Sequence, residues 1–114
     1  MATAPPLNVL KLAFAIHQAW SNVKAVYLFG SYAHGEQRNN SDVDLALLFA
    51  PSDAKRITLL NSLGQVQLES LLGVGVDLIN LQLVDTVFQN EIIHQGKVIF
   101  WPTTLLKASW MNLK

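Results

Sequence analysis

Apolar and polar positions repeat with two different periods along the chain, and each change of period marks a predicted element. From Leu7 to Trp20 the apolar residues recur at helical spacing, which predicts a first helix. Residues 23–29 form an apolar run rich in valine and aromatic residues, which ends at Gly30. Such a run, closed by a glycine, predicts a buried strand.

A second strand is predicted over residues 42–49. Its alternation places Asp42 and Asp44 on one face, and both faces become apolar beyond Asp44. A strand that is apolar on both faces is covered on both sides of its sheet. We therefore expect a central strand that carries its two carboxylates near its N-terminal end.

The second half of the chain alternates between helical and strand-like segments. We predict one helix over 52–72 with Ser52 as its N-cap, a strand over 74–81, a helix over 86–95 with Asp85 as its N-cap, a strand over 98–101, and a final helix or loose tail over 105–113. The first of these helices has a broad apolar stripe that we expect to lie in the core: Ile57, Leu60, Leu63, Val66, Leu71 and Leu72.

The order of these elements predicts an α+β fold, a mixed α/β-type sheet flanked by helices. Residues 30–41 are too few for an ordinary crossover helix, so the first two strands are expected to pair antiparallel or through a short helical turn. With 114 residues, the chain is expected to form a single domain over 1–114.

Composition narrows the possible functions. Eight Lys or Arg residues balance eight Asp or Glu residues, so the basic excess of a nucleic-acid-binding protein is missing. The absence of cysteine excludes disulfides, thiolate nucleophiles and cysteine-based zinc sites. No apolar run approaches the roughly 20 residues that span a bilayer, and the N-terminus does not resemble a signal peptide. We therefore expect a soluble, cytoplasmic protein with no direct contact to nucleic acid or membrane.

The candidate chemistry lies where the first strand passes into the second. Gly30-Ser31 is followed by ten residues and then by Asp42-Val43-Asp44. Two carboxylates two residues apart on a strand lie close together, and a divalent cation relieves the repulsion between them. Oxygen ligands without cysteine or paired histidines favour Mg²⁺, with Mn²⁺ as a second possibility, over zinc. The alternative for these residues is an ordinary strand–turn–strand with solvated acids.

Two further features complete the predicted site. Gly30 allows close approach of the backbone to a ligand, and Ser31, at the start of a helical turn, can hold a phosphate. Asp77 lies inside the third predicted strand. If that strand adjoins residues 42–49, Asp77 supplies a third carboxylate, which could bind a second metal ion and help to deprotonate an attacking hydroxyl. Without the rest of the motif, Asp77 would be interpreted as an ordinary surface carboxylate.

The run Gly30-Ser31, Asp42-Val43-Asp44 and Asp77 resembles the signature of the nucleotidyltransferase superfamily that includes DNA polymerase β. The similarity is greatest to the minimal nucleotidyltransferases, small proteins with the run GSYAxG…SDxDL, and it covers residues 23–100. The chain departs from this group at His34, where arginine is frequent.

This resemblance implies a polymerase β-like fold and transfer of AMP from ATP to an acceptor hydroxyl, with two Mg²⁺ ions. It implies that Asp42, Asp44 and Asp77 are catalytic metal ligands and that Gly30, Ser31 and Ser41 contact the nucleotide, although a loop cap is the other reading of Ser41. Minimal nucleotidyltransferases are often antitoxins that adenylylate a tyrosine of a HEPN-domain ribonuclease toxin, which implies such a toxin as partner in a hetero-oligomer. Two alternatives stay open: an antitoxin that acts by occlusion, and a small-molecule nucleotidyltransferase that needs a second subunit.

Overall fold

Within the residues that the structure describes, four strands form one mixed sheet in the order β3-β2-β1-β4. The computed structural model describes residues 8–38, 40–54, 59 and 62–100. The elements follow one another as α1 (Val9–Ala19), β1 (Val23–Phe29), the 3₁₀ turn η1 (Ser31–His34), β2 (Val43–Phe49), α2 (Pro51–Ala54), α3 (Leu63–Leu72), β3 (Val76–Asn80), the 3₁₀ turn η2 (Leu81–Leu83), α4 (Thr86–Gln95) and β4 (Lys97–Phe100).

The strand pairings explain where the site forms. β1 pairs antiparallel with β2 and with β4, whereas β2 and β3 run parallel. The antiparallel pairing of the first two strands is as predicted, and the short connection between them contains η1. The parallel pairing of β2 with β3 requires a long crossover, which α2 and α3 occupy.

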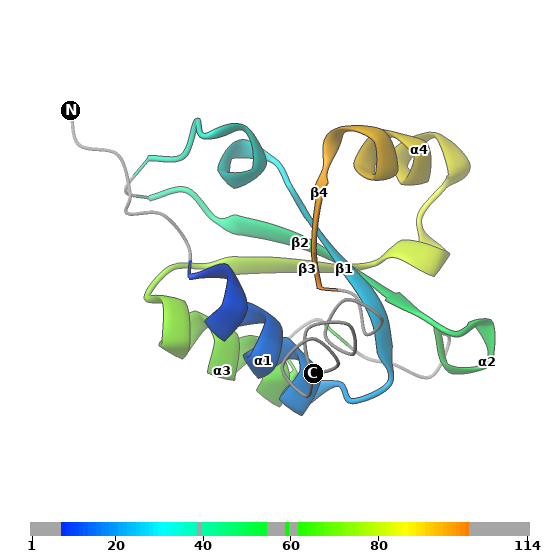
Figure 1. Ribbon diagram of the computed structural model, residues 1–114, viewed down its shortest axis with the longest axis horizontal. Coiled ribbons are helices and arrows are strands. Elements are labelled where there is room, and N and C mark those ends of the chain that lie inside the picture. The colour runs from blue at the N-terminus through cyan, green and yellow to red at the C-terminus, as the bar shows by residue number, and fades with distance from the viewer. Residues whose placement is uncertain (1–7, 39, 55–58, 60–61, 101–114) are drawn as a thin grey trace, which may run out of the picture.

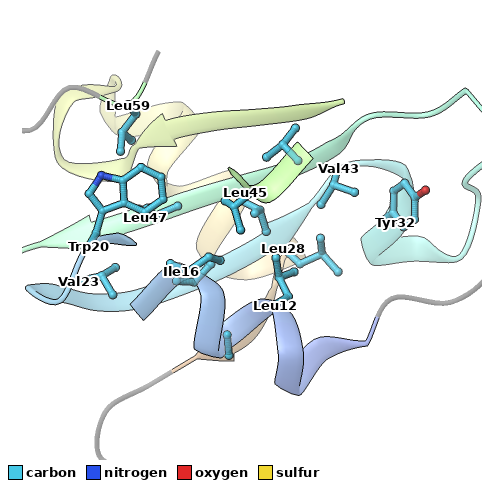
Figure 2. Packing of buried hydrophobic residues seen from close by; sticks show 14 of the residues in the cluster. Leu12, Ile16, Trp20, Val23, Leu28, Tyr32, Val43, Leu45, Leu47 and Leu59 are labelled. Atoms are coloured by element: carbon cyan, nitrogen blue, oxygen red, sulfur yellow. The ribbon is translucent and has the colours of Figure 1, made fainter. Parts of the chain in front are cut away.

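Helices cover both faces of the sheet, as expected for this fold class (Figure 1). Helices α1 and α3 lie on one face, over the larger of two apolar clusters, and α4 lies on the other face. In the larger cluster, Leu12 and Ile16 of α1 pack with Leu45 and Leu47 of β2 (Figure 2). Strand β2 is therefore central and covered on both sides, as its apolar faces predict.

The predicted single helix over 52–72 is wrong. α2 begins at Pro51, so Ser52 lies inside a short helix and does not cap one. A separate helix, α3, begins after Ser62, whose hydroxyl accepts a hydrogen bond from the Gln65 N–H at 3.1 Å. Residues 55–58, 60 and 61 lie outside the described part of the chain.

The new start of α3 changes which of its residues are buried. Gly64 and Leu68 are buried, with Leu72 partly buried, whereas Leu63 and Val66 of the predicted stripe are exposed. A Cβ on Gly64 would lie 2.6 Å from the Trp20 ring, so α3 approaches the end of α1 very closely. Leu71 of the predicted apolar stripe is also exposed. The stripe was drawn on a helix longer than α3, so its residues do not share one face of the actual helix.

Most other predicted elements are confirmed within one or two residues. β1 and α4 have the predicted bounds, and Asp85 caps α4 by accepting the Phe88 N–H at 2.9 Å. The predicted tail over 105–113 lies outside the described residues. Among the helices of the described segments, none is long and apolar enough to cross a membrane.

Candidate active site

The turn after β1 depends on Gly30 for two reasons. Its φ of 72° with ψ of −156° belongs to backbone that residues with a side chain essentially never adopt. A Cβ at this position would also overlap the carboxylate of Asp44. The Gly30 carbonyl accepts the Ala33 N–H at 3.1 Å, and this bond begins the η1 turn at Ser31. Gly30 thus lets the turn fold directly against the Asp44 side chain.

Asp44 lies at the centre of the candidate site. It is paired with Phe29 on β1 and with Asp77 on β3, so the two acids face each other across neighbouring strands. The pKa of Asp44 is raised from 3.8 to about 6. Burial is the main cause, followed by the charge of Asp77, a hydrogen bond to Asp77 and the charge of Asp42. The predicted third carboxylate is therefore next to Asp44, because β3 adjoins β2.

Asp42 lies just before β2 and is exposed. Next to it, the Gly75 carbonyl accepts the Val43 N–H at 2.9 Å. A Cβ on Gly75 would lie 2.5 Å from Asp42 Oδ1, so this glycine leaves room for the carboxylate. Gly75 was not among the predicted site residues. The signal that could have identified it is its position two residues before Asp77, on the same face of a strand.

The remaining residues of the turn and of the loop after it take different positions. Tyr32 is buried in the larger apolar cluster, so it packs the loop and does not line an open site (Figure 2). His34 is exposed at the end of η1, and Ser31 is half-buried at its start. The Ser41 hydroxyl accepts the Arg38 N–H at 2.8 Å, which is the loop-capping role. A contact from Ser41 to nucleotide stays a prediction.

The three acids fit Mg²⁺ by their chemistry, although they do not form a closed cage. Among the described residues, no group of three or more His, Cys, Asp or Glu side chains converges closely enough to hold a metal ion unaided. Mg²⁺ does not require such a cage, because it is commonly held by one or two carboxylates together with waters and substrate phosphates. The raised pKa of Asp44 reflects crowded negative charge that a divalent cation would relieve. Asp44 with Asp77, and Asp42 beside them, are the residues that would hold it.

The comparison with known protein families agrees with this fold and with the arrangement of the Gly30 turn beside the three acids. Residues 12–103 match the family described as Polymerase beta, Nucleotidyltransferase, and the chain belongs to this family. This confirms the family resemblance and the fold class drawn from the sequence.

Individual relatives narrow the comparison. The chain is 37% identical over 99 residues to protein adenylyltransferase MntA of Shewanella oneidensis, covering 85% of this chain and 67% of MntA. It superposes with a TM-score of 0.67 and 33% identity on a chain of a toxin–antitoxin structure with AMP-PNP, covering 83% of this chain and 74% of that one. A complex of tri-AMPylated Shewanella oneidensis HEPN toxin with its MNT antitoxin gives a TM-score of 0.60 at 25% identity, covering 93% and 86%.

Proposed function

We propose that this chain transfers AMP from ATP to a hydroxyl, most simply a tyrosine, of a HEPN-domain toxin and acts as that toxin's antitoxin. The observation that carries the proposal is the register of β2 and β3, which places Asp44 directly opposite Asp77 beside the Gly30 turn. The similarity to MntA and to the complex with an AMPylated toxin supports the choice of donor and acceptor.

In the proposed reaction the acceptor hydroxyl oxygen bonds to the α-phosphorus of ATP, and the bond from that phosphorus to the bridging oxygen breaks, so pyrophosphate leaves. Bound Mg²⁺ would supply electrostatic stabilisation of the attacking and leaving oxygens. Asp42 and Asp44 hold the donor side of the site. Asp77, exposed at the same edge, takes the proton of the acceptor hydroxyl.

The Gly30-Ser31 turn is suited to the phosphates of the donor. Gly30 has no side chain, and the Ser31 hydroxyl is half-buried at the start of η1. A glycine, which has no side chain, lets the backbone approach a ligand closely. The described residues offer no comparable feature for the acceptor, in keeping with an acceptor that a partner protein brings.

The proposal is tested by transfer of label from α-labelled ATP to a purified HEPN-domain toxin, with Mg²⁺ present. Asp42→Asn and Asp44→Asn should lower the rate by about 100-fold or more, since each removes a carboxylate that would hold Mg²⁺ at the reacting phosphate. Glu91→Gln removes a charge of the same sign at an exposed position of α4 and should leave the rate unchanged. Full transfer by the double Asp42, Asp44 variant would contradict the proposal.

The same variants separate catalysis from occlusion. An antitoxin that works by transfer loses neutralisation of the toxin in the Asp44→Asn variant, even when the two proteins still bind. An antitoxin that works by covering its partner keeps neutralising. Co-purification of the variant with the toxin, together with a ribonuclease assay of the complex, distinguishes these two results.

A further inference from the structure

Two side chains of α3 bind the backbone of one residue at the start of β3. Gln65 Nε2 donates to the Val76 carbonyl at 2.9 Å, and the Val76 N–H donates to Glu69 Oε2 at 3.0 Å. Gln65 and Glu69 are four residues apart and therefore lie on one face of the helix. Together they satisfy both polar groups of Val76, the residue directly before Asp77.

These bonds lie on the side of β3 that faces away from the sheet. The Gly75 carbonyl points to β2, where it accepts the Val43 N–H at 2.9 Å. Backbone groups of successive strand residues point to opposite sides, so those of Val76 point away from β2. In the sheet as described, β3 is an edge strand with β2 as its neighbour. The α3 side chains thus take the place of a further strand beside the candidate site.

We propose that Gln65 and Glu69 are positioning residues that fix Asp77 opposite Asp44 and so set the affinity of the site for Mg²⁺; the inference rests on the proposed function. β3 follows α3 after only three residues, two of which are glycines, so the connection itself holds the strand weakly. On its sheet side Asp77 depends on pairing with β2. On the other side the two α3 bonds hold the peptide before it. Removing them frees the start of β3 to shift and moves the Asp77 carboxylate away from Asp44.

A purely structural role, covering an edge strand, is the alternative explanation. It predicts that loss of the bonds lowers stability without a selective effect on Mg²⁺. A positioning role predicts a selective loss of Mg²⁺ affinity, since mutation of groups that orient metal ligands commonly lowers metal affinity or activity by about 10-fold to 100-fold. The two explanations therefore differ in whether the substitution changes the affinity for Mg²⁺, and not in whether it changes stability.

The experiment compares Glu69→Leu, Glu69→Gln and Gln65→Leu with Gln67→Leu, which changes an exposed residue of the same helix. The amide oxygen of Glu69→Gln can still accept the Val76 N–H, whereas a leucine cannot. Three quantities are measured: the Mg²⁺ concentration that half-saturates the rise in melting temperature, amide exchange over residues 75–78, and the Mg²⁺ dependence of AMP transfer.

We expect Glu69→Leu and Gln65→Leu to raise the half-saturating Mg²⁺ concentration by about tenfold in both the melting and the transfer assays. Amide exchange over residues 75–78 should become faster in the same two variants. Glu69→Gln should stay within about twofold of the original protein, and Gln67→Leu should match it.

Equal Mg²⁺ midpoints for all four variants, with only melting temperatures lowered, would overturn the positioning role. So would a Glu69→Gln variant as impaired as Glu69→Leu. If Glu69→Leu does not fold, Gln65→Leu decides the same question, because it removes the other bond to the same peptide. If the original protein binds Mg²⁺ but transfers no AMP to the toxin, the proposed function fails, and the melting and exchange measurements still decide whether Asp77 is positioned from α3.

Discussion

Replacing Asp44 by asparagine should stabilise the metal-free protein while removing its response to Mg²⁺. Asp44 is half-buried beside Asp77, and its pKa is raised from 3.8 to about 6. A folded pKa above the unfolded pKa means that folding takes up protons on this carboxyl. Its stabilising contribution is thus full at low pH and is lost as pH rises from about 4 to about 6. Above that window the ionised Asp44 destabilises the metal-free fold.

The size of this effect follows from the pKa. The difference between 3.8 and about 6 sets a ceiling of about 3 kcal/mol, since each pKa unit is worth about 1.4 kcal/mol. The carboxyl is only half-buried, and solvent screening reduces this to about 1 kcal/mol. An asparagine has nearly the same shape, carries no charge, and can donate its amide N–H to Asp77 as protonated Asp44 does. We therefore expect a gain of about 1 kcal/mol, or about 4 °C in melting temperature for a domain of this size.

The assay is thermal unfolding of chelator-treated protein at about pH 8 and about pH 4, followed by Mg²⁺ addition at the higher pH. Asp44→Asn should melt higher than the original protein at about pH 8 and equally at about pH 4. Added Mg²⁺ should stabilise the original protein and leave the variant unchanged. Glu91→Gln, which removes a charge at an exposed position of α4, should show neither effect. An Asp44→Asn variant that is less stable at about pH 8, or equally stabilised at both pH values, would refute the reasoning.

Three further predictions test other parts of the structure. The rate of AMP transfer at limiting Mg²⁺ should rise as pH increases through about 6, because Asp44 must lose its proton to bind the metal; a flat profile from about pH 5 to about pH 8 would contradict this. Gly30→Ala should lower Mg²⁺-dependent transfer by about 100-fold, since its Cβ would overlap the Asp44 carboxylate. Gly73 has a similar φ of 73°, but a Cβ there would meet nothing within 4 Å. Gly73→Ala should therefore lose only about 1–2 kcal/mol of stability in denaturant unfolding and keep its transfer rate. Ser62→Ala should lower the free energy of unfolding by about 1 kcal/mol and Ser52→Ala by less than about 0.5 kcal/mol, and equal losses would argue against Ser62 as the cap of α3.

The sequence predicts those parts of the fold whose signals are local. β1 ends just before Gly30, as its apolar run indicates, and Asp85 caps α4, as its position before a helical segment indicates. The alternation of β2 predicts its central position in the sheet, whereas Asp42 lies one residue before the strand and not within it. Each of these features depends on a few neighbouring residues, and tertiary packing leaves it unchanged.

The start of α3 could not be predicted from the same kind of signal. In the sequence, Ser52 and Ser62 each stand before a stretch with apolar residues at helical spacing, and either satisfies the pattern of an N-cap. Packing decides where α3 begins, because Gly64 fits against the Trp20 ring at the end of α1 and Leu68 lies in the core. A contact between residues so far apart in the chain leaves no periodic trace, so the longer helix was the simpler but wrong prediction.

The placement of Asp77 shows why a complete motif does not by itself define a site. A parallel pair of strands can slip by one residue, and such a slip would turn the Asp77 carboxylate to the opposite face of the sheet from Asp44. Apolar residues flank Asp77 on both sides, so the local pattern constrains the register only weakly. In the structure Val43 bonds to Gly75 on one side of β3, while Gln65 and Glu69 bind Val76 on the other. In the positioning role proposed for Gln65 and Glu69, the acids that the motif supplies become neighbours because two polar side chains of α3, outside the motif, hold the strand at one register.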